Sequence, residues 1–143
     1  MSVLRLAYYE LSSDLLQGFR QVKQGLEGSP LGLPIIELVY LRVSQINGCS
    51  FCLNMHTKAL RERGESERRL AELAGWRVSS QFTPREKAAL AWAESLTYVV
   101  NTHADDNDYL PVKEHFSDKE ISDLTFAIAL MNGMNRLAVG MRQ

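Results

Sequence analysis

The sequence predicts an all-α fold in a single domain that spans residues 1–143. Two capping boxes, residues 83–86 (TPRE) and 117–120 (SDKE), mark helix starts, and apolar residues elsewhere recur at helical spacing. No run combines the length and the strict alternation that are typical of a β-strand. A chain of 143 residues suits one domain and buries enough surface to be stable without a covalent staple.

The first half of the chain contains four expected helices, each bounded by a recognisable signal. An apolar stripe at helical spacing stops at Gly25. Pro34 suits the first position of the next helix, "IIELVYLRVSQIN", which is apolar enough to be buried and which Gly48 closes. Gly64 ends the helix that follows, and Ser66 caps a short one. The expected helices cover residues 8–25, 34–47, 49–63 and 67–75.

The second half predicts two longer helices, over residues 84–100 and 120–141. Between them, the acidic stretch "ADDND" is expected to be a capped turn, because it lacks the glycine and the terminal glutamate of a calcium-binding loop. The last helix is apolar nearly all round from Phe126 to Met131, so we expect cover on several sides, part of it from another subunit. We expect the following large side chains to lie in the core or an interface: Trp92, Met131 and Met134.

Composition and charge indicate a soluble protein without a nucleic-acid or membrane partner. The net charge is -1, the pI is about 6.3, and no basic stripe is present. Glu10 and Asp14 interrupt the apolar run that a signal peptide would need, and no segment approaches the length of a membrane span. We therefore expect a cytoplasmic protein, in whose reducing environment two neighbouring cysteines are more often catalytic or metal-binding than structural.

Both cysteines of the chain lie in residues 46–57, "INGCSFCLNMHT". On a helix, Cys49 and Cys52 are three positions apart and His56 follows Cys52 by four, so all three side chains line one face. A helix N-terminus and a nearby imidazole both favour the thiolate that thiol chemistry requires. Two thiols at this spacing also close a disulfide readily, so a sulfenic acid on one sulfur is resolved by the other. The motif therefore predicts thiol redox chemistry.

Glu37 adds a carboxylate to this pattern. It lies twelve residues before Cys49, inside the apolar helix that Pro34 opens. If this helix packs antiparallel to the cysteine helix, we expect the carboxylate to reach His56 directly or through water and to hold its tautomer. Glu37, Cys49, Cys52 and His56 are thus the candidate catalytic residues.

The four candidates follow the order E-x11-C-x2-C-x3-H, which resembles the core of the alkylhydroperoxidase D-like family within the carboxymuconolactone decarboxylase superfamily. The similarity extends to "FTPREKAALAWAESLT" and "FSDKEISDLTFAIALMNGMNRLAV", and so covers about residues 20–140. The resemblance implies an all-helical AhpD-like bundle, homo-oligomers from trimers to hexamers, and a peroxidase that reduces organic hydroperoxides.

The same resemblance implies a role for each residue. Cys52 would be the peroxidatic cysteine that becomes a sulfenic acid, and Cys49 the resolving thiol and proton donor, exposed enough to exchange with a reductant. Glu37 and His56 would form the proton relay. The implied reductant is a lipoylated protein or another dithiol, some members in turn reduce a peroxiredoxin, and no cofactor is expected. Phe51 stands where the best-known members have histidine; its ring shuttles no proton and is expected to line an apolar mouth for an alkyl hydroperoxide.

The residues by themselves leave other interpretations open. A decarboxylase of the carboxymuconolactone type does not need two neighbouring thiols, whereas a thiol-disulfide reductase or a redox sensor would use the same two sulfurs. A structural zinc site needs a fourth ligand. The remaining histidines, His103 and His115, lie far along the chain without supporting spacing, so we expect no metal.

Overall fold

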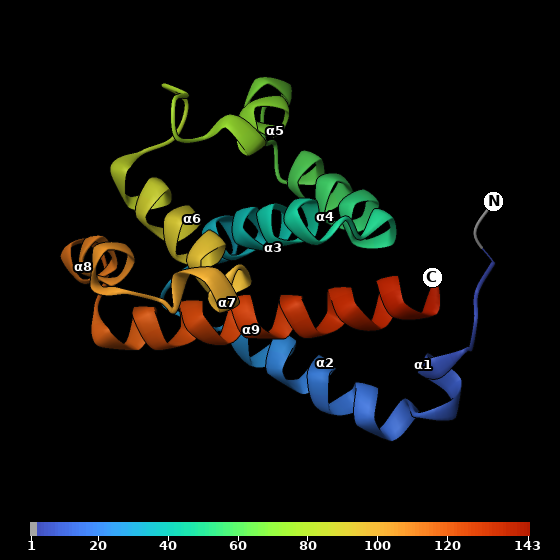
Figure 1. Cartoon of the computed structure of the whole chain (residues 1–143). Helices are drawn as coiled ribbons and strands as arrows, with labels where there is room; N and C mark the ends of the chain where they lie inside the picture. The colour runs from blue at the N-terminus through green and yellow to red at the C-terminus, as the bar shows by residue number, and fades with distance from the viewer. Residues whose placement is uncertain (1–2) are drawn as a thin grey trace.

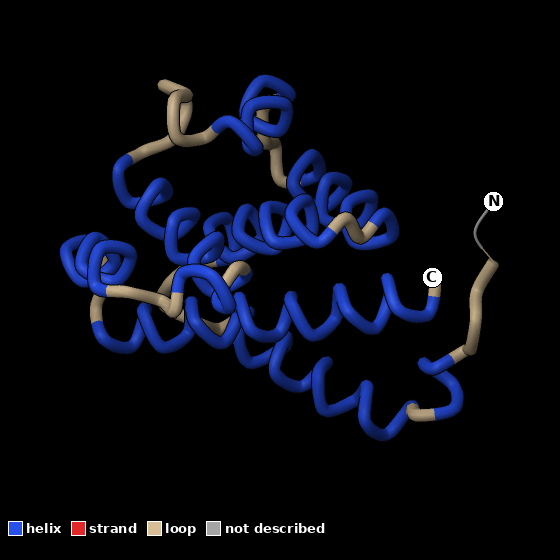
Figure 2. The backbone as a smooth tube through the Cα atoms, in the orientation of Figure 1, coloured by secondary structure: helices blue, strands red, loops and turns tan. Residues whose placement is uncertain are grey.

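The computed structural model describes residues 3–143, and over that range it contains helices and no strand (Figure 1 and Figure 2). The predicted all-α class is confirmed. The elements in chain order are α1 (Tyr8–Leu11), α2 (Ser13–Glu27), α3 (Leu33–Asn47), α4 (Ser50–Glu62), α5 (Glu67–Glu72), a 3-10 turn (Leu73–Gly75), α6 (Pro84–Thr97), α7 (Val99–Thr102), α8 (Asp106–His115) and α9 (Asp118–Met141).

Helix α3 lies at the centre of the fold and packs against α4, α6 and α9 (Figure 1). Its side chains are buried on several sides, and Ile36, Val39 and Val43 are each at most 1% exposed. β-branched residues cost a helix roughly 0.5 kcal/mol each, whereas burying such a side chain contributes about 1.5–3 kcal/mol. The prediction of a buried helix rather than a strand is therefore confirmed, and packing outweighs local propensity.

The predicted helix boundaries with strong capping chemistry are confirmed. Thr83 and Ser117 each accept a hydrogen bond from the backbone N–H three residues on, and the glutamate at that position bonds back to the capping residue. Gly48 closes α3 in the left-handed conformation, with φ +66°, and Gly64 follows α4 with φ +87°. These signals act over three or four residues, which is why the sequence reveals them.

Helix α8 was not predicted, because only a capped turn was expected at "ADDND". Asp105 caps this helix by accepting a hydrogen bond from the Asn107 N–H at 2.9 Å, and Val112 is fully buried. Pro111 lies inside the helix and removes one backbone donor, which hides the helical pattern. Packing of α8 against α6 compensates for that loss.

The long helix expected over residues 84–100 is divided in the structure, at Tyr98, into α6 and α7.

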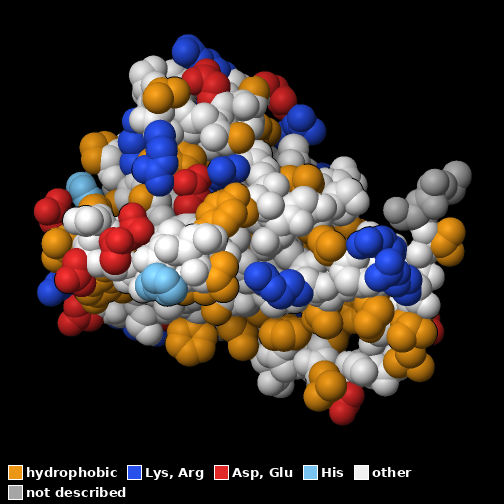
Figure 3. Space-filling view, in the orientation of Figure 1, with side chains coloured by type: hydrophobic (Ala, Val, Ile, Leu, Met, Phe, Trp, Pro, Cys, Tyr) orange, Lys and Arg blue, Asp and Glu red, His pale blue; other side chains and the backbone are white. Residues whose placement is uncertain are grey.

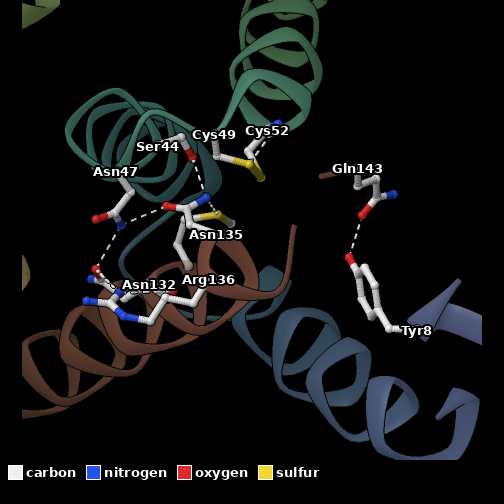
Figure 4. The surroundings of a disulfide bond; sticks show 10 residues. Tyr8, Ser44, Asn47, Cys49, Cys52, Asn132, Asn135, Arg136 and Gln143 are labelled. Atoms are coloured by element: carbon white, nitrogen blue, oxygen red, sulfur yellow. Dashed lines mark hydrogen bonds between the residues drawn. A yellow bond between two sulfur atoms is a disulfide. The ribbon is translucent and has the colours of Figure 1, made fainter. Parts of the chain in front are cut away.

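The two ends of the described chain lie side by side. The Arg5 N–H donates to the Met141 carbonyl at 2.8 Å, and the Tyr8 hydroxyl is bonded to the Gln143 side chain (Figure 4). These contacts hold α1 beside the last turn of α9. They place aromatic side chains from α1 next to the cysteine motif.

Helix α9 is covered on most of its length but leaves part of its apolar surface exposed. Met131 is fully buried and Trp92 is 6% exposed against the same core, as expected, and Met134 packs at its edge. Phe126 is instead 60% exposed, and apolar side chains gather along the lower face in Figure 3. None of the helices in the described part of the chain is long and apolar enough to cross a membrane.

Candidate functional site

The candidate site lies at the corner between α3 and α4, where the two cysteines form a disulfide (Figure 4). Gly48 turns the chain in the left-handed conformation, and Cys49 follows as the N-cap residue of α4 in an extended conformation. The Cys52 N–H donates to the Cys49 sulfur at 3.4 Å. The first turn of α4 therefore directs an N–H group, and the positive end of its dipole, toward Cys49. This environment stabilises a Cys49 thiolate when the disulfide is reduced.

The Cys49 sulfur is less exposed than the sequence resemblance implied. Cys49 is 1% exposed and Cys52 is 3% exposed, and both pack against Ala138 from the last turns of α9. The expectation of an exposed Cys49 is therefore not met within this chain. The reason is tertiary: α9 passes over the α3–α4 corner, and no local pattern near the cysteines encodes that cover.

Each sulfur lies beside a different pocket. Cys49 lines a pocket of about 340 Å³ together with Ser50 and Arg142, at the end of α9. Cys52 lines a smaller pocket of about 40 Å³, on the side of α1, whose other walls are largely apolar. These walls are Tyr8, Phe51, Met55, Met131, Met134, Ala138 and Gln143. The disulfide is therefore bordered by two pockets, one at each sulfur.

A buried amide network braces the corner (Figure 4). Asn135 of α9 is fully buried; its side-chain N–H donates to the Ser44 hydroxyl at 3.1 Å, and its oxygen accepts from Asn47 at 3.0 Å. Asn47 also donates to Asn132 at 3.0 Å. The network joins the last turn of α3 to α9 just before the cysteines. Sequence reasoning missed it, because its members lie far apart in the chain.

Replacing Asn135 with alanine is expected to lower the free energy of unfolding by about 2 kcal/mol, since it leaves the buried Ser44 hydroxyl without its partner. Urea unfolding of the oxidised protein measures this loss. Asn101→Ala, at an exposed position of α7, is the matched control and should unfold like the native chain. An equal stability of the Asn135→Ala variant and the native chain would contradict the structural role of the network.

His56 is a buried, neutral imidazole one turn after Cys52. It is 2% exposed, and its ring lies 5.2 Å from the Tyr40 ring, measured between centroids. Burial, with a smaller effect from the nearby Lys23 cation, lowers the pKa of His56 to about 4. Its Nε2 atom and the Tyr40 hydroxyl are both buried without a hydrogen-bond partner in the described chain. At neutral pH the imidazole is therefore uncharged, and its Nε2 atom is available to a hydrogen-bond partner.

Glu37 and His56 share a pocket but do not form the direct hydrogen bond that was one of the two expected arrangements. The Glu37 carboxylate instead accepts from the Arg63 guanidinium at 2.7 Å, and its side chain is 13% exposed. Both residues line a pocket of about 90 Å³, which Tyr40 also lines. The pocket volume and the two unpartnered polar atoms suit a bridging water. Of the two expected arrangements, the structure is compatible with the water-mediated contact between Glu37 and His56.

Two residues of this pocket were missed by the sequence analysis. Tyr40 lies one turn after Glu37 on α3, and burial together with the Glu37 charge raises the pKa of its hydroxyl. Arg63 lies seven positions after His56, at the end of α4. Helical spacing places Tyr40 on the same face as Glu37 and Arg63 on the same face as His56. This spacing is the sequence signal that identifies both residues.

Phe51 does not line that pocket but lies at the mouth of the cavity beside Cys52, which shares Met55 with it. Its side chain is 44% exposed, and it lines both the small pocket at Cys52 and a wider one of about 420 Å³. An apolar ring at this position adds apolar surface to the pocket and cannot transfer a proton.

In the described residues, no group of three or more His, Cys, Asp or Glu side chains is arranged to hold a metal ion.

Comparison with known proteins identifies similar chains. The profile of the Carboxymuconolactone decarboxylase family matches residues 13–95. The chain is 34% identical to "Uncharacterized protein YdfG" of Bacillus subtilis, over 96% of this chain and 93% of that protein. It is 33% identical to "Uncharacterized protein YnjA" of Escherichia coli, over 73% of this chain and 57% of that protein.

Solved structures share the whole architecture. A crystal structure from Agrobacterium tumefaciens superposes with a TM-score of 0.95 at 36% identity, covering 99% of this chain and 97% of that one. That protein is described as of unknown function and as a candidate antioxidant defence protein AhpD. An uncharacterized peroxidase-related protein from Silicibacter sp. has the same fold, with a TM-score of 0.81 at 24% identity over 92% of this chain and 70% of that one.

Proposed function

Because the chain belongs to the carboxymuconolactone decarboxylase family and is AhpD-like, we propose that it is a thiol peroxidase that reduces organic hydroperoxides through the Cys49–Cys52 pair. The observation that carries the proposal is the position of the disulfide. It joins the N-cap of α4 to a sulfur that lies one turn before a buried neutral imidazole and beside an apolar pocket. A family-level relation to peroxidases supports the same conclusion.

The proposed cycle begins at Cys52. Its thiolate attacks the terminal peroxide oxygen, the O–O bond breaks, and the alkoxide takes a proton and leaves as an alcohol. Cys52 is thereby oxidised to a sulfenic acid. The Cys49 sulfur then attacks the Cys52 sulfur, the S–S bond forms, and the hydroxyl leaves as water after taking a proton. An external dithiol reduces the disulfide and becomes a disulfide itself.

The proposed proton path runs through the pocket that Glu37, Tyr40 and His56 line. His56 lies one helical turn after Cys52, and its lowered pKa means that a proton it takes from Cys52 passes readily to the alkoxide. Glu37 and Tyr40 line the space into which the unpartnered polar atoms open, and a water there would connect them. Cys49 needs no such base, because the α4 N-terminus already stabilises its thiolate and makes it a ready resolving nucleophile.

The partners follow from the two sides of the site. A dithiol, such as a lipoyl group on a carrier protein, would approach through the pocket of about 340 Å³ beside Cys49, and a peroxiredoxin is a further candidate partner. The exposed apolar surface that includes Phe126 supports a homo-oligomer. The family resemblance suggests a trimer or hexamer. A reducing, cytoplasmic location suits a pair of thiols that must be regenerated.

The test is the initial rate of cumene hydroperoxide consumption by the native protein with dihydrolipoamide as reductant. The proposal predicts a rate well above that of the free dithiol. A rate equal to the free dithiol would contradict it, and reduction of a disulfide substrate such as insulin by the same protein would then favour a thiol-disulfide reductase. Decarboxylation of a carboxymuconolactone that persists in Cys52→Ser would favour the third alternative.

A further inference from the structure

We propose that the wide pocket beside Cys52 binds an amphiphile with an apolar tail and an anionic head group, which Arg20 and Lys23 recognise. The preferred substrate class is then a hydroperoxide of the fatty-acid type. The substrate half of this inference rests on the proposed peroxidase function. The binding half depends only on the pocket and its charges.

The pocket has the size and lining of a site for an apolar chain. Its volume is about 420 Å³, within the range of roughly 300–1,000 Å³ that is common for small-molecule sites. Leu16 on α2, Phe51 and Met55 on α4, and Met134 on α9 form its apolar walls. Methionine side chains adapt to flexible chains of different shape, because their three torsions rotate easily.

The polar rim of this pocket carries two cationic side chains and no acidic side chain. Leu16, Arg20 and Lys23 are four and three positions apart on α2, so they lie on one face of that helix. No aspartate or glutamate lines this pocket, and within residues 3–143 neither cation takes part in an ion pair. Lys23 also lines the neighbouring pocket, beside Glu27 and Glu37, whereas Arg20 lines only the wide one. The two cations at the edge of the apolar cavity complement an anionic head group.

The wide pocket adjoins the small pocket that the Cys52 side chain lines. Five residues line both it and the pocket of about 40 Å³ that contains Cys52: Tyr8, Phe51, Met55, Met134 and Gln143. The inner space is large enough for a hydroperoxide group but not for a whole substrate. A chain with its head group at Arg20 and Lys23 would thus present an oxidised carbon along the chain to Cys52.

The molecular surface agrees with this arrangement. At the end of the molecule that carries α1 and the C-terminus, Figure 3 shows Lys and Arg side chains beside a group of apolar side chains. Acidic groups in that view gather near α8, at the opposite end, and near α5. An anionic amphiphile is therefore attracted to the end of the molecule that contains the disulfide.

The binding test uses calorimetry of the full chain with decanoate and with decanol, which have the same chain length but differ in charge. We expect decanoate to bind about 10-fold more tightly than decanol, and Arg20→Gln and Lys23→Gln to weaken decanoate by about 3- to 5-fold each without affecting decanol. Lys58→Gln, at an exposed position of α4 outside every pocket described above, is the matched control. Equal affinity for decanoate and decanol, or no effect of either α2 variant, would overturn the inference.

A second measurement separates this inference from the proposed function. The ratio of kcat/KM for linoleic acid hydroperoxide over its methyl ester should exceed one and fall toward one in Arg20→Gln. If no hydroperoxide is consumed but decanoate binding depends on Arg20 and Lys23, the peroxidase proposal fails and the binding site stands. If cumene hydroperoxide is consumed but the acid and ester are equivalent, the anionic substrate class fails and the peroxidase stands.

Discussion

Serine in place of Cys52 is expected to lower the steady-state rate of hydroperoxide consumption by about a thousandfold or more, because the hydroxyl is a far weaker nucleophile than a thiolate. Serine in place of Cys49 is expected to abolish turnover as well, for a different reason. Its Cys52 still reacts once, but the sulfenic acid finds no resolving thiol. Both variants are therefore expected to lack appreciable steady-state turnover, but they differ in the first turnover.

Rapid mixing with cumene hydroperoxide in the absence of reductant distinguishes the two cysteines. Reduced Cys49→Ser should consume about one equivalent per subunit, and reduced Cys52→Ser should consume none. Asn54→Ser, an exposed position on the same helix, controls for the substitution itself and should behave as the native chain. A burst in Cys52→Ser and none in Cys49→Ser would reverse the two roles and make the N-cap sulfur the peroxidatic one.

The second large effect concerns acid stability and the buried imidazole of His56. In the folded chain the pKa of His56 is about 4, whereas the ordinary value, expected in the unfolded chain, is about 6.5. Between these values the unfolded chain binds a proton that the native chain does not. The free energy of unfolding therefore falls as the pH falls from 6.5 toward 4, by up to about 3 kcal/mol from this residue.

Urea unfolding at pH 7 and pH 4.5 measures this contribution as a difference between variants. The native chain should lose about 2–3 kcal/mol more than His56→Gln over this interval, because the variant has no group to protonate there. Carboxylates whose pKa is lowered by ion pairs, such as Glu86, add acid sensitivity to both proteins and cancel in the comparison. His115→Gln, at the exposed end of α8, is the matched control. Equal losses in the native chain and His56→Gln would contradict a buried neutral imidazole.

Local chemistry explains why much of the fold could be read from the sequence. The capping boxes at Thr83 and Ser117 and the glycine that closes α3 act through hydrogen bonds that span only a few residues. The same reasoning failed at α8, because Pro111 breaks the local pattern that packing against α6 restores. Local signals thus predict an element reliably only when its own residues encode it.

The features of the candidate site are likewise of two kinds, those that local sequence encodes and those that tertiary packing sets. The sequence by itself determined that Cys49, Cys52 and His56 share a face of α4, since helical geometry requires it. Only the tertiary structure decided that α9 buries both sulfurs, that Glu37 pairs with Arg63, and that each sulfur has its own pocket. These features depend on how helices distant in the chain pack together. Burial and long-range contacts therefore set the chemistry that a correctly recognised motif can perform.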